Sequence, residues 1–218
     1  MHTALNASSA TGDQVRSAML GSGFWPMLRQ RPFDVMPTPT SQPRDIFVSG
    51  FDSAPLAPTA GQVLEGRMDV FRAGLAFLNA MLDGKKVELG VRAGDDTFSQ
   101  VSEANITSFD GPHPAGNVGV QIHNVRPMNK GEEVWTVTLQ DVANIGEGLS
   151  QGRYVAKRIV ALTGSRSQPA LLDTTIGAPM SHLIADRVMM EDTRVISGHA
   201  LTGSLRGEEG ALGFFDQQ

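Results

Sequence analysis

An amphipathic helix with a strand on either side is the feature that most limits what this chain can form. The helix begins with Thr59 and Gln62, spaced as a capping box, and ends at Gly84, a common helix terminator. Between them, six apolar side chains recur at intervals of four and three residues and so share one helix face: Leu64, Met68, Phe71, Leu75, Leu78 and Leu82. The apolar run at 45–49 precedes this helix, and the run at 86–91 follows it. Strand, helix and strand in this order predict parallel strands joined by a right-handed crossover, and so an α/β sheet.

Further along the chain the same pattern continues and then changes. A β-prone run at 134–139, a helix from Asp141 to Leu149 and a strand at 158–163 extend the α/β domain, which we assign to residues 1–165. A strand with a turn, a short helix at 180–185 and another strand then follow within about fifty residues. They predict a small α+β module over residues 166–218. Its glycine-rich tail, 203–218, is expected to fray or to dock on a part of the protein that is not present.

Composition excludes several classes of function. The chain has 218 residues, a net charge of −5 and no run of Lys or Arg longer than a pair, which disfavours a nucleic-acid partner. It has no cysteine, which rules out disulfides, Cys-bound zinc and thiolate-bound iron–sulfur clusters. No apolar run approaches the ~20 residues of a membrane span, and residues 1–10 lack the features of a signal peptide. These observations favour a soluble protein and a cytoplasmic location.

The segment 111–124, Gly-Pro-His-Pro-Ala-Gly-Asn-Val-Gly-Val-Gln-Ile-His-Asn, is the most distinctive loop candidate. Its prolines fix φ and its glycines permit close backbone approach, as in a shaped loop at the mouth of a site. A plain surface turn is the alternative. The alternation over 118–122 predicts a strand. His113 and His123 lie here without a carboxylate at ligand spacing, so no metal site is expected.

Other polar positions carry weaker signals. Asp52 and Ser53 follow the carboxyl end of the first predicted strand, where α/β sheets place ligands, although such residues also cap helices. The turn at 21–23 offers glycines to a phosphate, but the rings of Phe24 and Trp25 would occupy that space, so we favour an ordinary turn. No nucleophile elbow, Walker loop or HExxH motif is present, and no catalytic residues are expected.

Several short blocks together resemble a known family. Ser-Gly-Phe-Trp at 22–25, Arg-Pro-Phe at 31–33 and Gly-Pro-His-Pro-Ala-Gly at 111–116 are similar to the A-subunit of the Na⁺-translocating NADH:quinone oxidoreductases. Val-Trp-Thr at 134–136 and Arg-Val-Ile-Ser-Gly at 194–198 agree with this. The family in turn resembles the C-subunit of the Rnf complex and the flavoprotein subunit of complex I. The resemblance implies a Rossmann-like parallel-sheet domain followed by a β-grasp (SLBB-like) module.

The departures from those flavoprotein relatives shape the expected function. Their longer Gly-rich loop is reduced here to 21–23, and their cluster cysteines have no counterpart. The resemblance therefore implies a subunit without a tightly bound cofactor, structural and associated with ubiquinone. Its partners would be membrane subunits at the cytoplasmic face of the bacterial inner membrane. Quinone contact is expected from Phe24, Trp25, His113 and His123. A flavin- or NADH-binding oxidoreductase domain and an isolated ligand-binding module are the alternatives.

Overall fold

A computed structural model describes residues 3–165, 167–189, 193–199, 201–207 and 209–216 of the chain. The first domain is built on a five-stranded sheet of order β1-β5-β2-β3-β4. Its four parallel strands are β2 (Asp45–Ser49), β3 (Val87–Arg92), β4 (Ala104–Phe109) and β5 (Val134–Thr138), and β1 (Arg29–Arg31) pairs antiparallel to β5 at the edge. Counted along the chain, the parallel strands lie in the order 3-2-1-4 of a Rossmann-like half. The predicted α/β class is confirmed.

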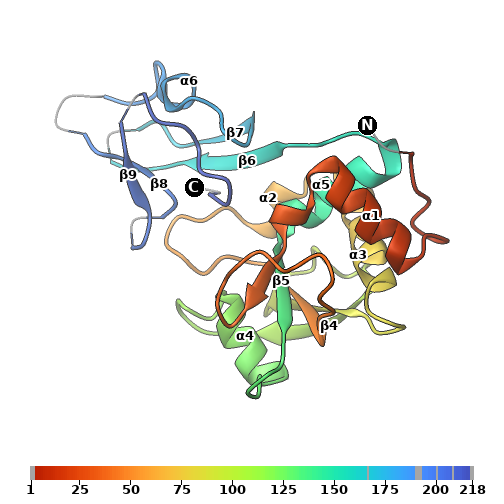
Figure 1. Cartoon of the computed structure of the whole chain (residues 1–218). Coiled ribbons are helices and arrows are strands. Elements are labelled where there is room, and N and C mark those ends of the chain that lie inside the picture. The colour runs from red at the N-terminus through yellow and green to blue at the C-terminus, as the bar shows by residue number, and fades with distance from the viewer. Residues whose placement is uncertain (1–2, 166, 190–192, 200, 208, 217–218) are drawn as a thin grey trace.

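Helices cover both faces of this sheet (Figure 1). On one face lie α1 (Gly12–Ser22), α3 (Met68–Ala80) and α5 (Leu139–Gln151), which pack on one another and on the strands. On the other face α4 (Val118–Val125) packs against β2. The short α2 (Ala60–Val63) and the 3-10 turn η1 (Trp25–Met27) complete the domain.

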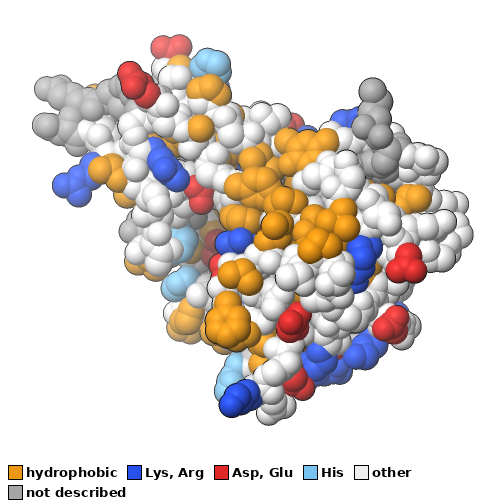
Figure 2. All heavy atoms as spheres, viewed as in Figure 1, with side chains coloured by type: hydrophobic (Ala, Val, Ile, Leu, Met, Phe, Trp, Pro, Cys, Tyr) orange, Lys and Arg blue, Asp and Glu red, His pale blue; other side chains and the backbone are white. Residues whose placement is uncertain are grey.

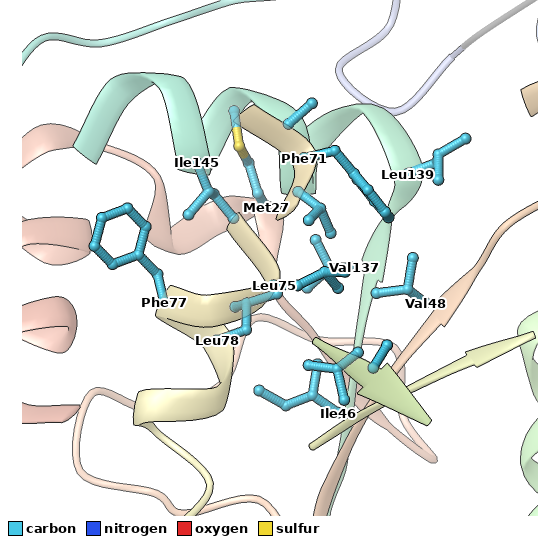
Figure 3. Packing of buried hydrophobic residues seen from close by; sticks show 14 of the residues in the cluster. Met27, Ile46, Val48, Phe71, Leu75, Phe77, Leu78, Val137, Leu139 and Ile145 are labelled. Atoms are coloured by element: carbon cyan, nitrogen blue, oxygen red, sulfur yellow. The ribbon is translucent and has the colours of Figure 1, made fainter. Parts of the chain in front are cut away.

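The main hydrophobic core lies between α1, α3, α5 and the sheet (Figure 3). Phe71, Leu75 and Leu78 of α3 point into it, as the four-and-three spacing predicted, and all three are fully buried. Helices α3 and α5 cross closely: a Cβ on Gly74 would lie 2.0 Å from the carbonyl oxygen of Val142. Two helices therefore touch through backbone at this crossing, a contact that only glycine permits.

The predicted single helix over 59–84 is interrupted. The capping box of Thr59 and Gln62 starts α2 as expected, but the chain turns at Gly66, whose φ is +66°, before α3 begins. Arg67 lies in this turn and is buried, and its guanidinium bonds Asn144 and Glu147 of α5. The apolar spacing persists through the break because Leu64 still faces the core. The pattern thus predicted the buried face correctly and the helix continuity wrongly.

The predicted strand at 118–122 is also wrong, because these residues form α4. Val118, Ile122 and Val125 are spaced four and three apart and pack together with Phe47 and Val134 on the second face of the sheet. In so short a window, apolar residues at every second position fit a helix as well as a strand.

Within its described residues, the second module contains two small antiparallel sheets and one helix. β6 (Lys157–Leu162) pairs with β7 (Ala170–Thr175), and β8 (Val195–Ser197) pairs with β9 (Ser204–Arg206). The helix α6 (Met180–Ile184) and Leu212 bury apolar side chains against the β6–β7 sheet. The strand β6 was assigned to the first domain, but its partner β7 lies beyond residue 165; the boundary at 165 stays a prediction.

Polar side chains of α5 hold β6 in place. The side-chain amide of Gln140 donates to the carbonyl of Ile159 at 2.8 Å and accepts from its N–H at 2.7 Å, so it replaces a neighbouring strand. Arg158 and Asp141 form an ion pair at 3.0 Å with both side chains fully buried. Arg158 also donates to the carbonyl of Phe214, whose ring packs on the main core, and Asp216 bonds Ser197, so these tail residues contact this chain, which differs from the expected fraying. Gln217 and Gln218 lie outside the described residues.

Candidate functional site

A cavity of about 540 Å³ opens at the carboxyl ends of β2 and β5. Ser49 of β2 pairs with Thr138 of β5 here, where the strand order reverses: β3 and β4 follow on one side of β2, and β5 lies on its other side. Open α/β sheets bind ligands at such topological switch points because the diverging connections leave a crevice there. We call this the switch-point cavity. Residues from five segments of the first domain line it: Arg31, Ser49–Asp52, Pro58–Val63, Gly116–Val120 and Thr136–Leu139. The second module contributes His199.

Two loops are fastened together beside the cavity. Ser49 Oγ lies 2.8 Å from the carbonyl oxygens of both Phe51 and Gly116, and it accepts from the side-chain amide of Gln121 at 2.9 Å. The N–H of Gly116 donates to Ser53 Oγ at 2.8 Å. A Cβ at Gly116 would lie 2.5 Å from the backbone nitrogen of Ser53, so only glycine fits. These bonds fix the loop at 111–117 onto the loop that follows β2.

The first turn of α4 offers backbone donors to the cavity. Val118 and Gly119 line it, and their N–H groups find no acceptor among the described residues. The N-cap residue Asn117 makes no side-chain capping bond, so the helix leaves these donors open. The positive end of the helix dipole points the same way, which favours a carbonyl oxygen or an anion at this wall.

His113 and His199 meet at the rim of the cavity. Their rings are 5.8 Å apart and nearly perpendicular, and His113 Nδ1 lies 3.1 Å from Ser53 Oγ. His199 Nδ1 accepts the N–H of Leu201 at 3.2 Å, which leaves the ring's N–H on Nε2, within 3.0 Å of Thr202 Oγ1. Sequence alone could not pair them because His199 follows β8 in the second module, about 85 residues further along the chain. Among the described residues no group of three or more His, Asp or Glu is placed to hold a metal.

The other expected contact residues lie elsewhere. Phe24 is buried in the main core, with its ring 5.1 Å from that of Tyr154. Trp25 is buried edge-on to Trp135, and its indole N–H donates to Pro37 at 2.8 Å. His123 is exposed on α4, outside the cavity lining. Of the four residues expected to contact quinone, only His113 lies next to the switch-point cavity.

The glycine turn at 21–23 is the end of a helix. Gly23 adopts the left-handed conformation at the C-cap of α1, and its N–H, like that of Phe24, bonds the carbonyl of Met19. Amides occupied in this way cannot hold a phosphate. The turn at 21–23 is therefore an ordinary one, as expected, and its amides are occupied by the helix cap, which differs from the expected reason that the rings of Phe24 and Trp25 fill the space. In this topology a phosphate loop would follow β2, where the chain runs ten residues from Gly50 before α2 begins.

Comparison with known proteins gives matches over both domains. Residues 10–154 match the family model described as "NqrA second alpha/beta domain", and residues 159–206 match the one described as "NQRA C-terminal domain". The chain is 38% identical over 220 residues to the A-subunit of the Na(+)-translocating NADH-quinone reductase of Yersinia pestis bv. Antiqua (strain Angola), covering 100% of this chain and 49% of that protein. The protein of the same name from Serratia proteamaculans (strain 568) is 41% identical over 207 residues, which is 93% of this chain and 46% of that one. This chain spans about half the length of the curated relatives that it matches.

A solved structure shares the fold. The NAD⁺-reducing [NiFe]-hydrogenase in the air-oxidized state contains a chain that superposes with a TM-score of 0.67 at 15% identity. The match covers 97% of this chain and 46% of that chain. At this identity the similarity concerns the fold alone.

Proposed function

The chain belongs to the NqrA family, and from that premise we propose that it serves as a structural, ubiquinone-associated part of a membrane-bound Na⁺-translocating NADH:quinone reductase. The observation that carries the proposal is the match of both domains, in order, across the whole chain at 36–41% identity. No helix in the described part of the chain is long and apolar enough to cross a membrane. We propose attachment at the cytoplasmic face of the bacterial inner membrane through other subunits of the complex.

An exposed apolar hairpin supports association with such partners. The segment after β1 turns back so that Gln30 and Val35 bridge, with Phe33 at the tip. Phe33, Val35 and Met36 are 77%, 46% and 51% exposed. Figure 2 shows hydrophobic side chains gathered on this side of the first domain. Apolar side chains grouped on a surface commonly mark a contact with another protein.

The docking proposal is tested by co-purification. The tagged chain is expressed with the remaining subunits of the complex, as wild type and as Phe33→Ser. We expect the wild type to retain the other subunits and Phe33→Ser to lose them. Leu201→Ser is the matched control, because Leu201 is 58% exposed in the second module and should tolerate the change. Retention by all three proteins would place the docking surface elsewhere, and failure of the wild type would refute the subunit role.

For quinone association, the switch-point cavity supplies suitable chemistry. A quinone ring is flat and carries two carbonyl oxygens that only accept hydrogen bonds. The open N–H groups of Val118 and Gly119 provide donors, and His199 lines the same cavity. Aliphatic side chains such as Val63 and Val137 also line the cavity, together with the charged Arg31 and Asp52. We therefore assign the ring to this cavity in place of Phe24 and Trp25.

One amide can be removed to test this assignment. Proline is well accepted at the first position of a helix, where it lacks only the N–H that the helix does not use. Val118→Pro should leave α4 folded and weaken binding of a tail-less ubiquinone analogue, measured by calorimetry, by about tenfold, or ~1.4 kcal/mol. Val118→Ala is the control, because it shortens the side chain and keeps the N–H. Equal affinities for the two variants would contradict the assignment.

A flavin- or NADH-binding domain is the second candidate, favoured by the position of the cavity at the switch point. The connection after β2 argues against it, because no helix N-terminus follows that strand directly to receive a phosphate. Absorbance of the purified chain for bound flavin and calorimetric titration with NADH separate the two candidates. Stoichiometric flavin that survives purification would overturn the cofactor-less proposal.

A further inference from the structure

A second cavity, of about 250 Å³, lies between the small module and the loop that follows β2. Its walls are apolar side chains of β6, β7, α6 and β8, among them Val160, Leu172, Leu183 and Val195. Arg194 is the one charged residue among those that line it. The module's own buried cluster is small and borders this cavity, since all five of its residues line it: Val160, Met180, Leu183, Ile184 and Leu212. An apolar cavity without an occupant costs stability, since the lining atoms lose contacts on one side.

The two cavities adjoin along one seam between the domains. The loop after β2 borders both, since Phe51 and Asp52 line the switch-point cavity while Pro55 and Leu56 line the apolar one. The residues that follow β8 also border both cavities: Gly198 lines the apolar cavity, and His199 lines the switch-point cavity. A smaller cavity of about 180 Å³ shares Asp52 and His199 with the switch-point cavity and Gly198 with the apolar one, and polar side chains such as Ser197 and Asp216 also line it. The seam therefore carries three cavities that share lining residues.

The residue at the mouth of the apolar cavity is unusual. Leu56 has φ of +67° and is 66% exposed. A leucine in the left-handed region is strained, and an apolar side chain held there in solvent gains nothing from burial. Strain of this kind persists where the surroundings impose it and often marks a ligand-binding loop. An apolar ligand entering the cavity would cover this side chain.

We propose that the apolar cavity holds the isoprenoid tail of the quinone whose ring occupies the switch-point cavity, the tail passing along the seam beside Gly198 and His199. The inference rests on the proposed quinone association and adds to it the part of the ligand that the second module recognises. The polar donors are concentrated in the switch-point cavity and the aliphatic side chains in the apolar one, which matches a ligand with a carbonyl-bearing ring and a hydrocarbon tail. Both domains are needed to form this site, because the ring cavity takes His199 from the second module.

The first test is the dependence of affinity on tail length. Ubiquinone analogues with no tail, one isoprene unit and two are titrated into the full chain. We expect each added unit to lower the dissociation constant at least about tenfold, as burial of several CH₂ groups predicts. Binding of the tail-less analogue without any gain from the tail would overturn this inference and leave the proposed function standing. Failure of all three analogues to bind would refute the proposed function itself.

A pair of variants locates the tail. Leu172 lines the apolar cavity, whereas the neighbouring Leu171 points to the other face of β7 and is 43% exposed. Leu172→Trp should fill the cavity and abolish the dependence on tail length while the tail-less analogue binds as before. Leu171→Trp, the matched control, should keep the wild-type dependence. An unchanged dependence in Leu172→Trp would overturn the inference.

A measurement without substitutions guards against a variant that misfolds. A ubiquinone analogue with a photoreactive group at the end of its tail is crosslinked to the wild-type chain. We expect the label on peptides from 160–196, and a ring-labelled analogue on peptides from 49–63 or 116–120. A tail label confined to the first domain would contradict the proposed path.

Discussion

Removal of Arg158 tests how the small module is fixed over the cavity. Its guanidinium is fully buried, pairs with Asp141 at 3.0 Å and donates to the carbonyl of Phe214 at 2.8 Å. Arg158→Met would leave the Asp141 carboxylate buried with only the hydroxyl of Thr138 as a side-chain partner. Breaking one side of a buried pair costs about 3–5 kcal/mol. We expect this loss in the free energy of unfolding at pH 7, measured by urea titration with tryptophan fluorescence.

The pH dependence of that loss has a definite sign. Burial raises the pKa of Asp141, and Arg158 and Thr138 oppose the rise. Without Arg158 the pKa rises further, so the folded variant binds a proton more tightly than the unfolded chain, whose Asp has a pKa of about 3.9. Stability of the variant then falls as pH rises from the unfolded pKa through the folded one. We expect the deficit relative to wild type to be larger at pH 7.5 than at pH 5.

The control is an arginine in an exposed ion pair. Arg153 bonds Glu147 at 2.6 Å, but its side chain is 53% exposed, and such pairs contribute at most about 1 kcal/mol. Arg153→Met should therefore change stability little at either pH. A deficit for Arg158→Met no larger than that of the control, or one that grows toward low pH, would refute the reasoning.

Three further predictions follow from single contacts. Gly146→Ala should lower the free energy of unfolding by about 1–3 kcal/mol, because the added Cβ would lie 1.8 Å from a carbonyl oxygen of α3. Gly21→Ala is the control: no atom lies within 4 Å of its Cβ, so this change should raise the free energy of unfolding by about 0.5–1 kcal/mol. Thermal melts measure both. Arg72 lowers the pKa of Glu103 through a bidentate hydrogen bond, so stability from this pair is present above the unfolded pKa and lost as pH falls through the folded one. Arg72→Met should therefore lose less stability than the wild type as the pH falls below about 4.5. The same pH dependence of unfolding in the variant and the wild type would contradict this. Gly116→Ala should displace the two fastened loops and weaken binding of the tail-less quinone about tenfold in calorimetry, and an unchanged affinity would show that the fastening does not shape the cavity.

The sequence predicted the sheet because its signals were local. The buried strands 45–49 and 134–138 are short apolar runs, and the helix between the first two parallel strands carries its buried face at regular spacing. The break at Gly66 was missed because the turn keeps Leu64 on the buried side. The spacing of the apolar residues is therefore the same as in an unbroken helix. The helix α4 was missed because five residues are too few to distinguish the two periods.

The candidate site was only partly visible in the sequence. The loop at 111–117 was singled out by its prolines and glycines, and Asp52 and Ser53 by their place after a strand; all three lie at the switch-point cavity or beside it. His199 could not be connected to them, because its position depends on how the second module packs. Phe24 and Trp25 lie buried in the core, as expected for an ordinary turn followed by two buried aromatics, and their contact with quinone stays a prediction.

The most direct test of whether the switch-point cavity binds quinone is a crystal structure of the chain soaked with a ubiquinone analogue that carries one isoprene unit. We expect density for the ring between the ends of β2 and β5, with one carbonyl oxygen within hydrogen-bond distance of the Val118 N–H and the tail directed along Gly198 toward the apolar cavity. A cavity left empty at saturating ligand, or a ring bound only at Phe24 and Trp25, would contradict the proposed quinone site.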